Sequence, residues 1–232
     1  MRFLDNADPG FSATARRLGI TSAIVVLGLQ IVYAITLAVG FLSLTSPEQP
    51  IGDPMFAILE TLIILMMPAM VGLMVAVHAW APAQKKTLSL TALAFMILVA
   101  GVTCSLHFLI LTLGRQPSLV GMPELRSPLT FEWPSVAYAL DILAWDVFFA
   151  VSMFFAAPVF TGSKLELSIR ALMVISGVLA LAGLAGIVAG DMRLRNIGIV
   201  GYLGVFLFIA ALLAKLFHRA NPISDSTGDP NG

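Results

Sequence analysis

Residues 54–80 read PMFAILETLIILMMPAMVGLMVAVHAW, and this stretch decides the fold class. Its 27 residues include one acidic side chain, Glu60, and neither lysine nor arginine. A helix needs roughly 20 residues to cross about 30 Å of hydrocarbon, so the stretch is long enough to span a bilayer. We predict a membrane-spanning helix here.

Five further apolar runs of similar length accompany it. The predicted spans lie near residues 19–43, 54–80, 88–113, 134–161, 168–189 and 197–217. Backbone groups in lipid must be satisfied within each segment, and long runs without period-two alternation exclude the strands of an outer-membrane barrel. The sequence therefore predicts an all-α integral membrane protein built as a six-transmembrane-helix bundle.

The composition agrees with this fold class and excludes others. Of the 232 residues 59% are hydrophobic and only 11% are charged, whereas a soluble domain carries about a quarter charged residues. Thirteen basic residues balance thirteen acidic ones, which argues against nucleic acid as a partner. The single cysteine, Cys104, excludes an internal disulfide framework. The lipid bilayer is the partner that the composition predicts.

The lysines and arginines predict how the bundle is oriented. By the predicted segmentation nine of them lie on one side of the membrane and four on the other. Because basic loops resist translocation, both termini are expected in the cytoplasm. The expected organisation is a cytoplasmic tail over 1–18, a transmembrane domain over 19–218 and a flexible cytoplasmic tail over 219–232. The compact layout suggests a multi-pass protein of the inner (cytoplasmic) membrane of a bacterial-type cell.

Prolines punctuate the predicted helices and loops. Asp53 and Pro54 resemble an N-cap and a first helical position. Pro68 lies inside the second span, where it removes a backbone hydrogen bond and leaves the carbonyl of Ile64 to find another partner. The longest connection, 114–133, contains three prolines and is either an ordered lid over the bundle or a stiffened linker.

Glycines recur along the last two spans, at the positions Gly183, Gly186, Gly190, Gly198, Gly201 and Gly204. Small residues at such spacings let two helix backbones approach closely in lipid. We expect the fifth and sixth spans to form a tight antiparallel hairpin. The alternative is that the glycine faces form the contact of a homo-oligomer.

The most informative pattern is a layer of ionisable residues inside the spans. Glu60, His107 and Asp141 come from three different spans, yet each lies six or seven residues from the same end of its span. At the helical rise all three are on the order of 9 Å below the outer boundary. Charged groups at this depth require partners or a wet cavity, so we expect a polar pocket in the outer half of the bundle.

Further polar residues are predicted to support this layer. Asp146 lies deeper on the fourth span and, in a regular helix, points roughly 140° away from Asp141. Tyr138 and Trp145 stand three and four residues from Asp141 and are candidate hydrogen-bond donors to it. Two more candidates are Cys104, one turn before His107, and Gln30, midway along the first span.

These residues support competing hypotheses of function. The first is proton-linked transport of a cation or small solute, in which Glu60, His107, Asp141 and Asp146 bind protons or substrate. The second is a metal-dependent enzyme in which Glu60, His107 and Asp141 hold a divalent ion such as Zn²⁺, Fe²⁺ or Mn²⁺. The sequence contains no haem or nucleotide signature.

Two further hypotheses assign no chemistry to the layer. It can be a purely structural ion-pair cluster, with Arg193 or Arg195 reaching down to neutralise one acid. The protein can also be a non-catalytic scaffold or accessory subunit. An apolar pack would hold the helices together at a lower desolvation cost, and this favours a functional role for the charges.

Overall fold

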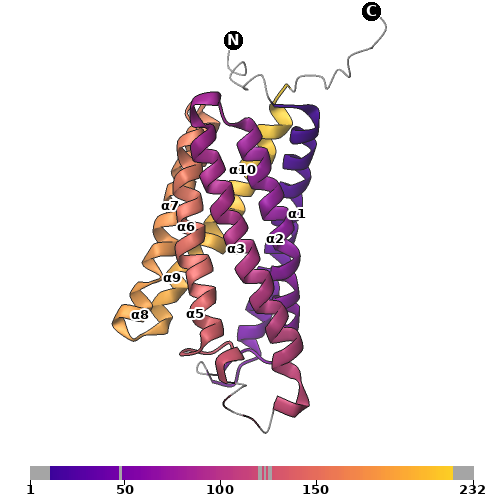
Figure 1. Cartoon of the computed structure of the whole chain (residues 1–232), viewed down its shortest axis with the longest axis vertical. Coiled ribbons are helices and arrows are strands. Elements are labelled where there is room, and N and C mark those ends of the chain that lie inside the picture. Colours follow the sequence, from indigo (N-terminus) through magenta and orange to yellow (C-terminus); the bar gives the residue numbers. More distant parts are fainter. Residues whose placement is uncertain (1–10, 47–48, 120–121, 123, 125–126, 222–232) are drawn as a thin grey trace, which may run out of the picture.

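The computed structural model describes residues 11–46, 49–119, 122, 124 and 127–221, and in this part of the chain the regular structure is helical throughout. Six helical rods are long and apolar enough to cross a membrane, and they pack as one bundle (Figure 1). The chain is therefore a polytopic membrane protein with a six-helix bundle, as the apolar runs predict.

Several spans are composite. The first and second are single helices, α1 (Ala13–Leu42) and α2 (Met55–Trp80). The third comprises η1 (Ala83–Lys85), α3 (Lys86–Thr112) and η2 (Leu113–Arg115). The fourth comprises α5 (Val136–Ile142), η5 (Leu143–Phe148), α6 (Phe149–Ala156) and η6 (Ala157–Val159). The fifth comprises α7 (Lys164–Ala182) and α8 (Ala185–Ala189), and the sixth comprises η7 (Met192–Arg195), α9 (Asn196–Ile199), η8 (Val200–Val205) and α10 (Phe206–Arg219).

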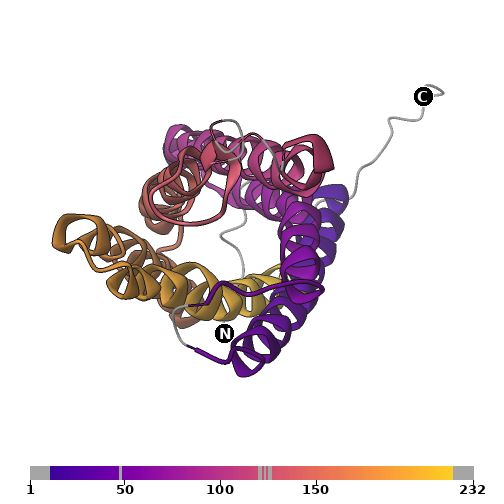
Figure 2. The ribbon, with the colours of Figure 1, turned by 90° about the horizontal axis from the view of Figure 1, so that it is seen from below.

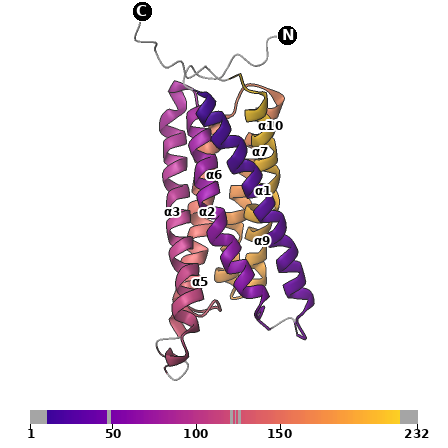
Figure 3. The ribbon, with the colours of Figure 1, turned by 90° about the vertical axis from the view of Figure 1, so that its right-hand side faces the viewer.

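Both described ends of the chain lie at the same end of the bundle, which we call the terminal end (Figures 1 and 3). There the ring of Phe11 packs edge-on against Trp80 at 5.2 Å and stacks on Phe217 at 5.6 Å. Arg16 joins the same two ends by donating to the carbonyl oxygens of Phe217 at 3.0 Å and His218 at 2.8 Å. The opposite end, which we call the distal end, carries the described residues of the 113–135 connection.

Four spans begin earlier than predicted: the third begins at Ala83 and the sixth at Met192, rather than near residues 88 and 197, and side-chain caps extend the other two at the terminal end. The first starts at Ala13 rather than near residue 19, and the Ser12 hydroxyl accepts a hydrogen bond from the backbone N–H of Ala15 at 3.1 Å. The fifth starts at Lys164 rather than near residue 168. There Ser163 and Glu166 form a reciprocal capping box, a pattern that is readable in the sequence. The predicted tails, 1–18 and 219–232, fall largely outside the described residues.

The second span differs from its predicted start, because Pro54 is the N-cap residue and not the first helical position. Its helix begins at Met55, one residue later than expected, and the Asp53 carboxylate accepts from the N–H of Ala57 at 3.2 Å. The carbonyl that Pro68 leaves without its helical donor belongs to Ile64. It accepts a weak hydrogen bond from the Cys104 thiol, with an S···O distance of 3.9 Å.

The fifth and sixth spans pack tightly against each other within the chain. A Cβ placed on Gly201 would lie 2.7 Å from the carbonyl oxygen of Ser176, so only glycine allows this approach. Gly190 has a different role, because it ends α8 in the left-handed conformation at φ 68°. The predicted hairpin is present, whereas a contact between copies stays a prediction.

Buried apolar side chains make up most of the core, and the predicted layer of Glu60, His107 and Asp141 lies toward the distal end. Viewed from below in Figure 2, the helices surround a central region. Met70, Phe149, Met153 and Phe206 are fully buried members of the apolar core.

Candidate functional site

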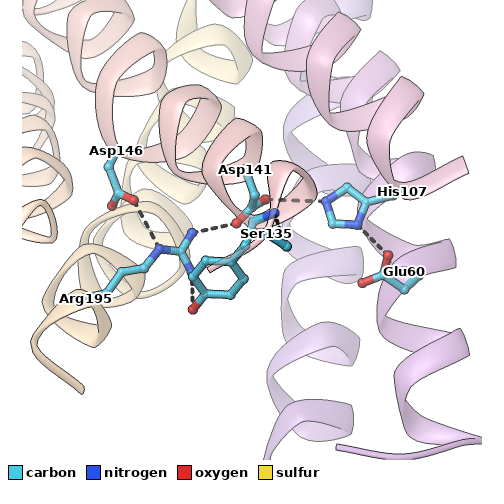
Figure 4. Close-up of polar contacts among 7 residues, drawn as sticks. Glu60, His107, Ser135, Asp141, Asp146 and Arg195 are labelled. Atoms are coloured by element: carbon cyan, nitrogen blue, oxygen red, sulfur yellow. Dashed lines mark hydrogen bonds and ion pairs between the residues drawn. The ribbon is translucent and has the colours of Figure 1, made fainter. Parts of the chain in front are cut away.

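The predicted layer converges on the imidazole of His107. Its Nδ1 lies 2.6 Å from Glu60 Oε2, and its Nε2 lies 3.5 Å from Asp141 Oδ1 (Figure 4). All three residues are buried, with 2–4% of their surface exposed. Residues on α2, α3 and α5 are thus joined through one ring, as their shared depth predicts. Their role in function stays a prediction.

Arg195 extends this chain on the far side of Asp141. Its guanidinium binds Asp141 Oδ2 at 2.5 Å and Asp146 Oδ2 at 3.3 Å, and it donates to the Tyr138 hydroxyl at 3.2 Å. By the predicted segmentation Arg195 lies two residues before the sixth span, and the sequence suggests it only as a group that neutralises one acid. In the structure the span begins at Met192, so Arg195 lies inside it. Its central position depends on how the fourth and sixth spans pack.

A π-helical turn explains how both aspartates reach one guanidinium. In a regular helix Asp141 and Asp146 would point far apart, but residues 143–148 form the π-helix η5. Bonding from i to i+5 widens the turn, so that a residue five positions along returns to nearly the same face. The predicted divergence of the two carboxylates is therefore wrong, and the cause is local helix geometry that periodicity does not reveal.

The sixth span contains a second π-helix, η8, whose carbonyl groups are bonded from other spans. The Gln30 side-chain amide donates to the carbonyl of Tyr202 at 3.1 Å, and the Ser176 hydroxyl donates to that of Gly201 at 2.9 Å. Hydrogen bonds from neighbouring helices to main-chain carbonyls are expected where the regular backbone hydrogen bonding of a span is interrupted. Gln30 thus bonds a neighbouring helix and, among the described residues, makes no hydrogen bond with the predicted layer that it was expected to support.

Glycines make room for Asp146. A Cβ on Gly183 would lie 2.6 Å from Asp146 Oδ1, and the same oxygen faces Gly198. In the described part of the chain this oxygen has no hydrogen-bond partner, and the residue has no exposed surface. The glycines of the fifth and sixth spans therefore accommodate a buried carboxylate as well as close helix packing.

A cavity of about 330 Å³ lies beside the network, and we call it the distal pocket. Its deep wall includes Gln30 and Tyr202, and it extends to Gln49, Pro50 and Asn196, which are exposed at the distal end. The network residues that line it are Glu60, His107, Asp141 and Arg195. Asp146 does not line it and contacts the pocket through Arg195 alone.

Part of the 113–135 connection covers this pocket. Phe131 lines the cavity, and its ring centre lies 5.6 Å from that of His107 and 5.1 Å from that of Tyr138. Arg115 anchors the connection by an ion pair with Asp53 at 2.8 Å. These contacts favour an ordered cover over a free linker, although Pro123 and its neighbours at 120–121 and 125–126 lie outside the described residues.

The neighbouring Arg193 shows what an ordinary surface arginine does here. Its side chain is 90% exposed and pairs with Asp191 at 3.1 Å. The backbone N–H and then the side chain of Arg193 lower the pKa of Asp191. Arg193 and Arg195 are two residues apart, yet only the second enters the bundle.

Two predicted donors to Asp141 have other roles, so that expectation is wrong. Tyr138 accepts a hydrogen bond from Arg195, whose guanidinium carbon lies 4.7 Å from the centre of the tyrosine ring. Trp145 lines the pocket, and its indole N–H has no partner among the described residues. Cys104 bonds the Ile64 carbonyl and does not join the network.

The donor geometry does not favour a metal centre. Glu60 and Asp141 bind opposite nitrogens of His107, so the ring separates the two carboxylates that a shared ion would require together. Among the described residues no group of three His, Cys, Asp or Glu side chains is arranged to hold a metal ion. The arrangement is that of a chain in which the imidazole is hydrogen-bonded to Glu60 and lies within ion-pair distance of Asp141.

The charges of the network do not balance. The three carboxylates of Glu60, Asp141 and Asp146 meet one guanidinium and one imidazole. With all carboxylates ionised the cluster carries two negative charges when His107 is neutral and one when it is protonated. The site can therefore take up protons or a cation.

These features define a six-helix polytopic membrane protein with a buried charged cluster beside a distal pocket. Comparisons with family models, with curated proteins and with solved structures found no match to the chain.

Proposed function

We propose that the protein is a proton-linked transporter of a small cationic solute. The observation that carries the proposal is the buried chain from Glu60 through His107 and Asp141 to Arg195, which lines a pocket at the distal end. Imidazole changes charge in the physiological range, and its two nitrogens here contact two carboxylates. Uptake of a cation beside Glu60 would favour release of a proton from His107.

The bundle has the features that such exchange requires. Toward the terminal end the pocket meets an apolar barrier that includes Met66, Phe149 and Phe206, which are buried. In this conformation the site therefore faces the distal side. The π-helices η5 and η8 and the interrupted ladder near Pro68 are places where spans can bend.

The orientation of transport follows from the basic residues. Arg16, Arg17, Lys85, Lys86, Lys164, Arg170, Lys215 and Arg219 belong to helix starts, helix ends and connections at the terminal end. We propose that this end faces the cytoplasm of an inner membrane, so that the pocket opens outward. A C-terminal fluorescent-protein fusion should then fluoresce in cells and a C-terminal alkaline-phosphatase fusion should be inactive. The reverse pattern would contradict the orientation.

Transport can be tested in proteoliposomes that contain a pH-sensitive dye. We expect gradients of at least one cation from a panel of Na⁺, K⁺, ethanolamine and tetraethylammonium to drive proton movement. Glu60→Gln and His107→Gln should abolish it, whereas His78→Gln should not. His78 is a matched control because it bonds Ser89 at 2.8 Å near the other end of α2.

Two results would contradict transport. One is that no cation of the panel moves protons through the wild-type protein. The other is that His107→Gln, shown to be helical and monodisperse, moves protons as the wild type does. Either outcome would leave the cluster with a structural role.

A further inference from the structure

The distal pocket is unusually rich in aromatic side chains. All three tyrosines of the chain line it, together with Trp145 and three phenylalanines. At its deep end the rings of Trp145 and Tyr202 lie 5.1 Å apart, and near the mouth Phe56 and Phe131 lie 6.4 Å apart. A solute in the pocket is therefore held between ring systems at both ends.

One of these rings already binds a cation. The guanidinium carbon of Arg195 lies 4.7 Å from the centre of the Tyr138 ring. This distance is within the range in which the negative face of an aromatic ring attracts a positive charge. Tyr33, Trp145 and Tyr202 line the same cavity, and among the described residues no cationic side chain lies over their rings.

Charge and aromatic lining together restrict the class of solute. The surplus negative charge of the cluster disfavours an anion. A small inorganic cation needs several converging oxygen ligands, whereas Glu60 and Asp141 are held on opposite sides of the His107 ring. Aromatic faces beside carboxylates instead suit an alkyl-substituted ammonium group, because a nitrogen surrounded by carbon is weakly hydrated.

The remaining walls suit apolar substituents on such a cation. Leu37 and Phe41 line the pocket from α1, and Ile199 and Leu203 line it from the sixth span. Phe41 is 54% exposed, so this wall continues onto the outer surface of the bundle. A cavity of about 330 Å³ is at the small end of the range for organic ligands.

We propose that the distal pocket binds an organic ammonium cation with apolar substituents, held by Glu60 and by the rings of Tyr33, Trp145 and Tyr202. This rests on the proposed function and names its substrate class. When the cation binds, His107 releases its proton to water at the distal end, so that the bound positive charge replaces the proton. One cation is exchanged for one proton, and the charge of the site is unchanged.

Binding can be tested with two probes of equal shape. Benzyltrimethylammonium carries a quaternary nitrogen where neopentylbenzene carries a neutral carbon. In calorimetric titrations of the detergent-purified full chain, we expect the cation to bind at least tenfold more tightly than the neutral molecule. Titrations in two buffers of different ionisation enthalpy should show release of about one proton for each cation bound.

Variants identify the groups that recognise the cation. Tyr33→Leu should weaken binding of benzyltrimethylammonium by about 5- to 30-fold, whereas Tyr33→Phe, which keeps the ring, should stay within about twofold of the wild type. Glu60→Gln should weaken it at least tenfold. Phe208→Leu is the matched control, because Phe208 is an aromatic residue of the sixth span that is 61% exposed and outside the pocket.

Three results would overturn this assignment: equal binding of the two probes, no binding of the cation to folded protein, or equal effects of Tyr33→Leu and Tyr33→Phe. Failure of transport is a separate result. A protein that binds benzyltrimethylammonium but moves no protons in proteoliposomes contradicts only the proposed function. A protein that exchanges protons for Na⁺ or K⁺ but does not bind benzyltrimethylammonium contradicts only the substrate class.

Discussion

Replacing Arg195 by methionine should destabilise the bundle more than any other single arginine replacement. The guanidinium contacts Asp141 at 2.5 Å and Asp146 at 3.3 Å, and the three side chains are 6%, 6% and 0% exposed. Methionine fills a similar volume but leaves two buried carboxylates without their cation. Breaking a buried ion pair from one side costs about 3–5 kcal/mol, so we expect the free energy of unfolding to fall by that amount.

The measurement is an SDS titration in mixed micelles followed by tryptophan fluorescence. Arg193→Met is the matched control, since Arg193 is 90% exposed, and it should change the free energy of unfolding by less than about 0.5 kcal/mol. Adding Asp146→Asn to Arg195→Met should restore about 1–3 kcal/mol, because one unpaired carboxylate is removed. If the two arginine variants are equally stable, the argument that Arg195 neutralises this cluster is refuted.

Three further substitutions, two beside the site and one at the terminal end, can be measured by the same titration. Gly183→Ala should lower the free energy of unfolding by about 1–3 kcal/mol, because its Cβ would lie 2.6 Å from a buried carboxylate oxygen. Gly28→Ala is the control and should be neutral or stabilising, because open space surrounds Gly28. Equal effects of the two substitutions would contradict the packing described for Gly183. Gln30→Leu should cost at most about 1–2 kcal/mol, since it removes one interhelical hydrogen bond to the Tyr202 carbonyl, and a larger loss would show a wider role. Ser163→Ala should cost about 1 kcal/mol by removing a helix cap, and no change would show that the capping box adds nothing.

The charged cluster could be predicted in part from depth along each helix. Glu60, His107 and Asp141 occupy one layer because the helical rise is constant, and counting residues from the span ends is enough to align them. Asp146 could not be placed in the same way, because the π-helix that turns it toward Arg195 breaks the regular period. The bond of Cys104 could not be predicted, because its partner, the Ile64 carbonyl, is left without a helical donor by a proline on another helix.

Apolar runs of sufficient length determined the number of spans and the helical fold by themselves, because each helix in lipid must satisfy its own backbone. The same counting shows at what depth each charge lies. Only the tertiary structure decided which helices are neighbours. As a result, only the structure shows that Arg195 joins two aspartates and that the tyrosines line one pocket. Rotation and packing of helices depend on contacts between distant residues, which local periodicity does not contain.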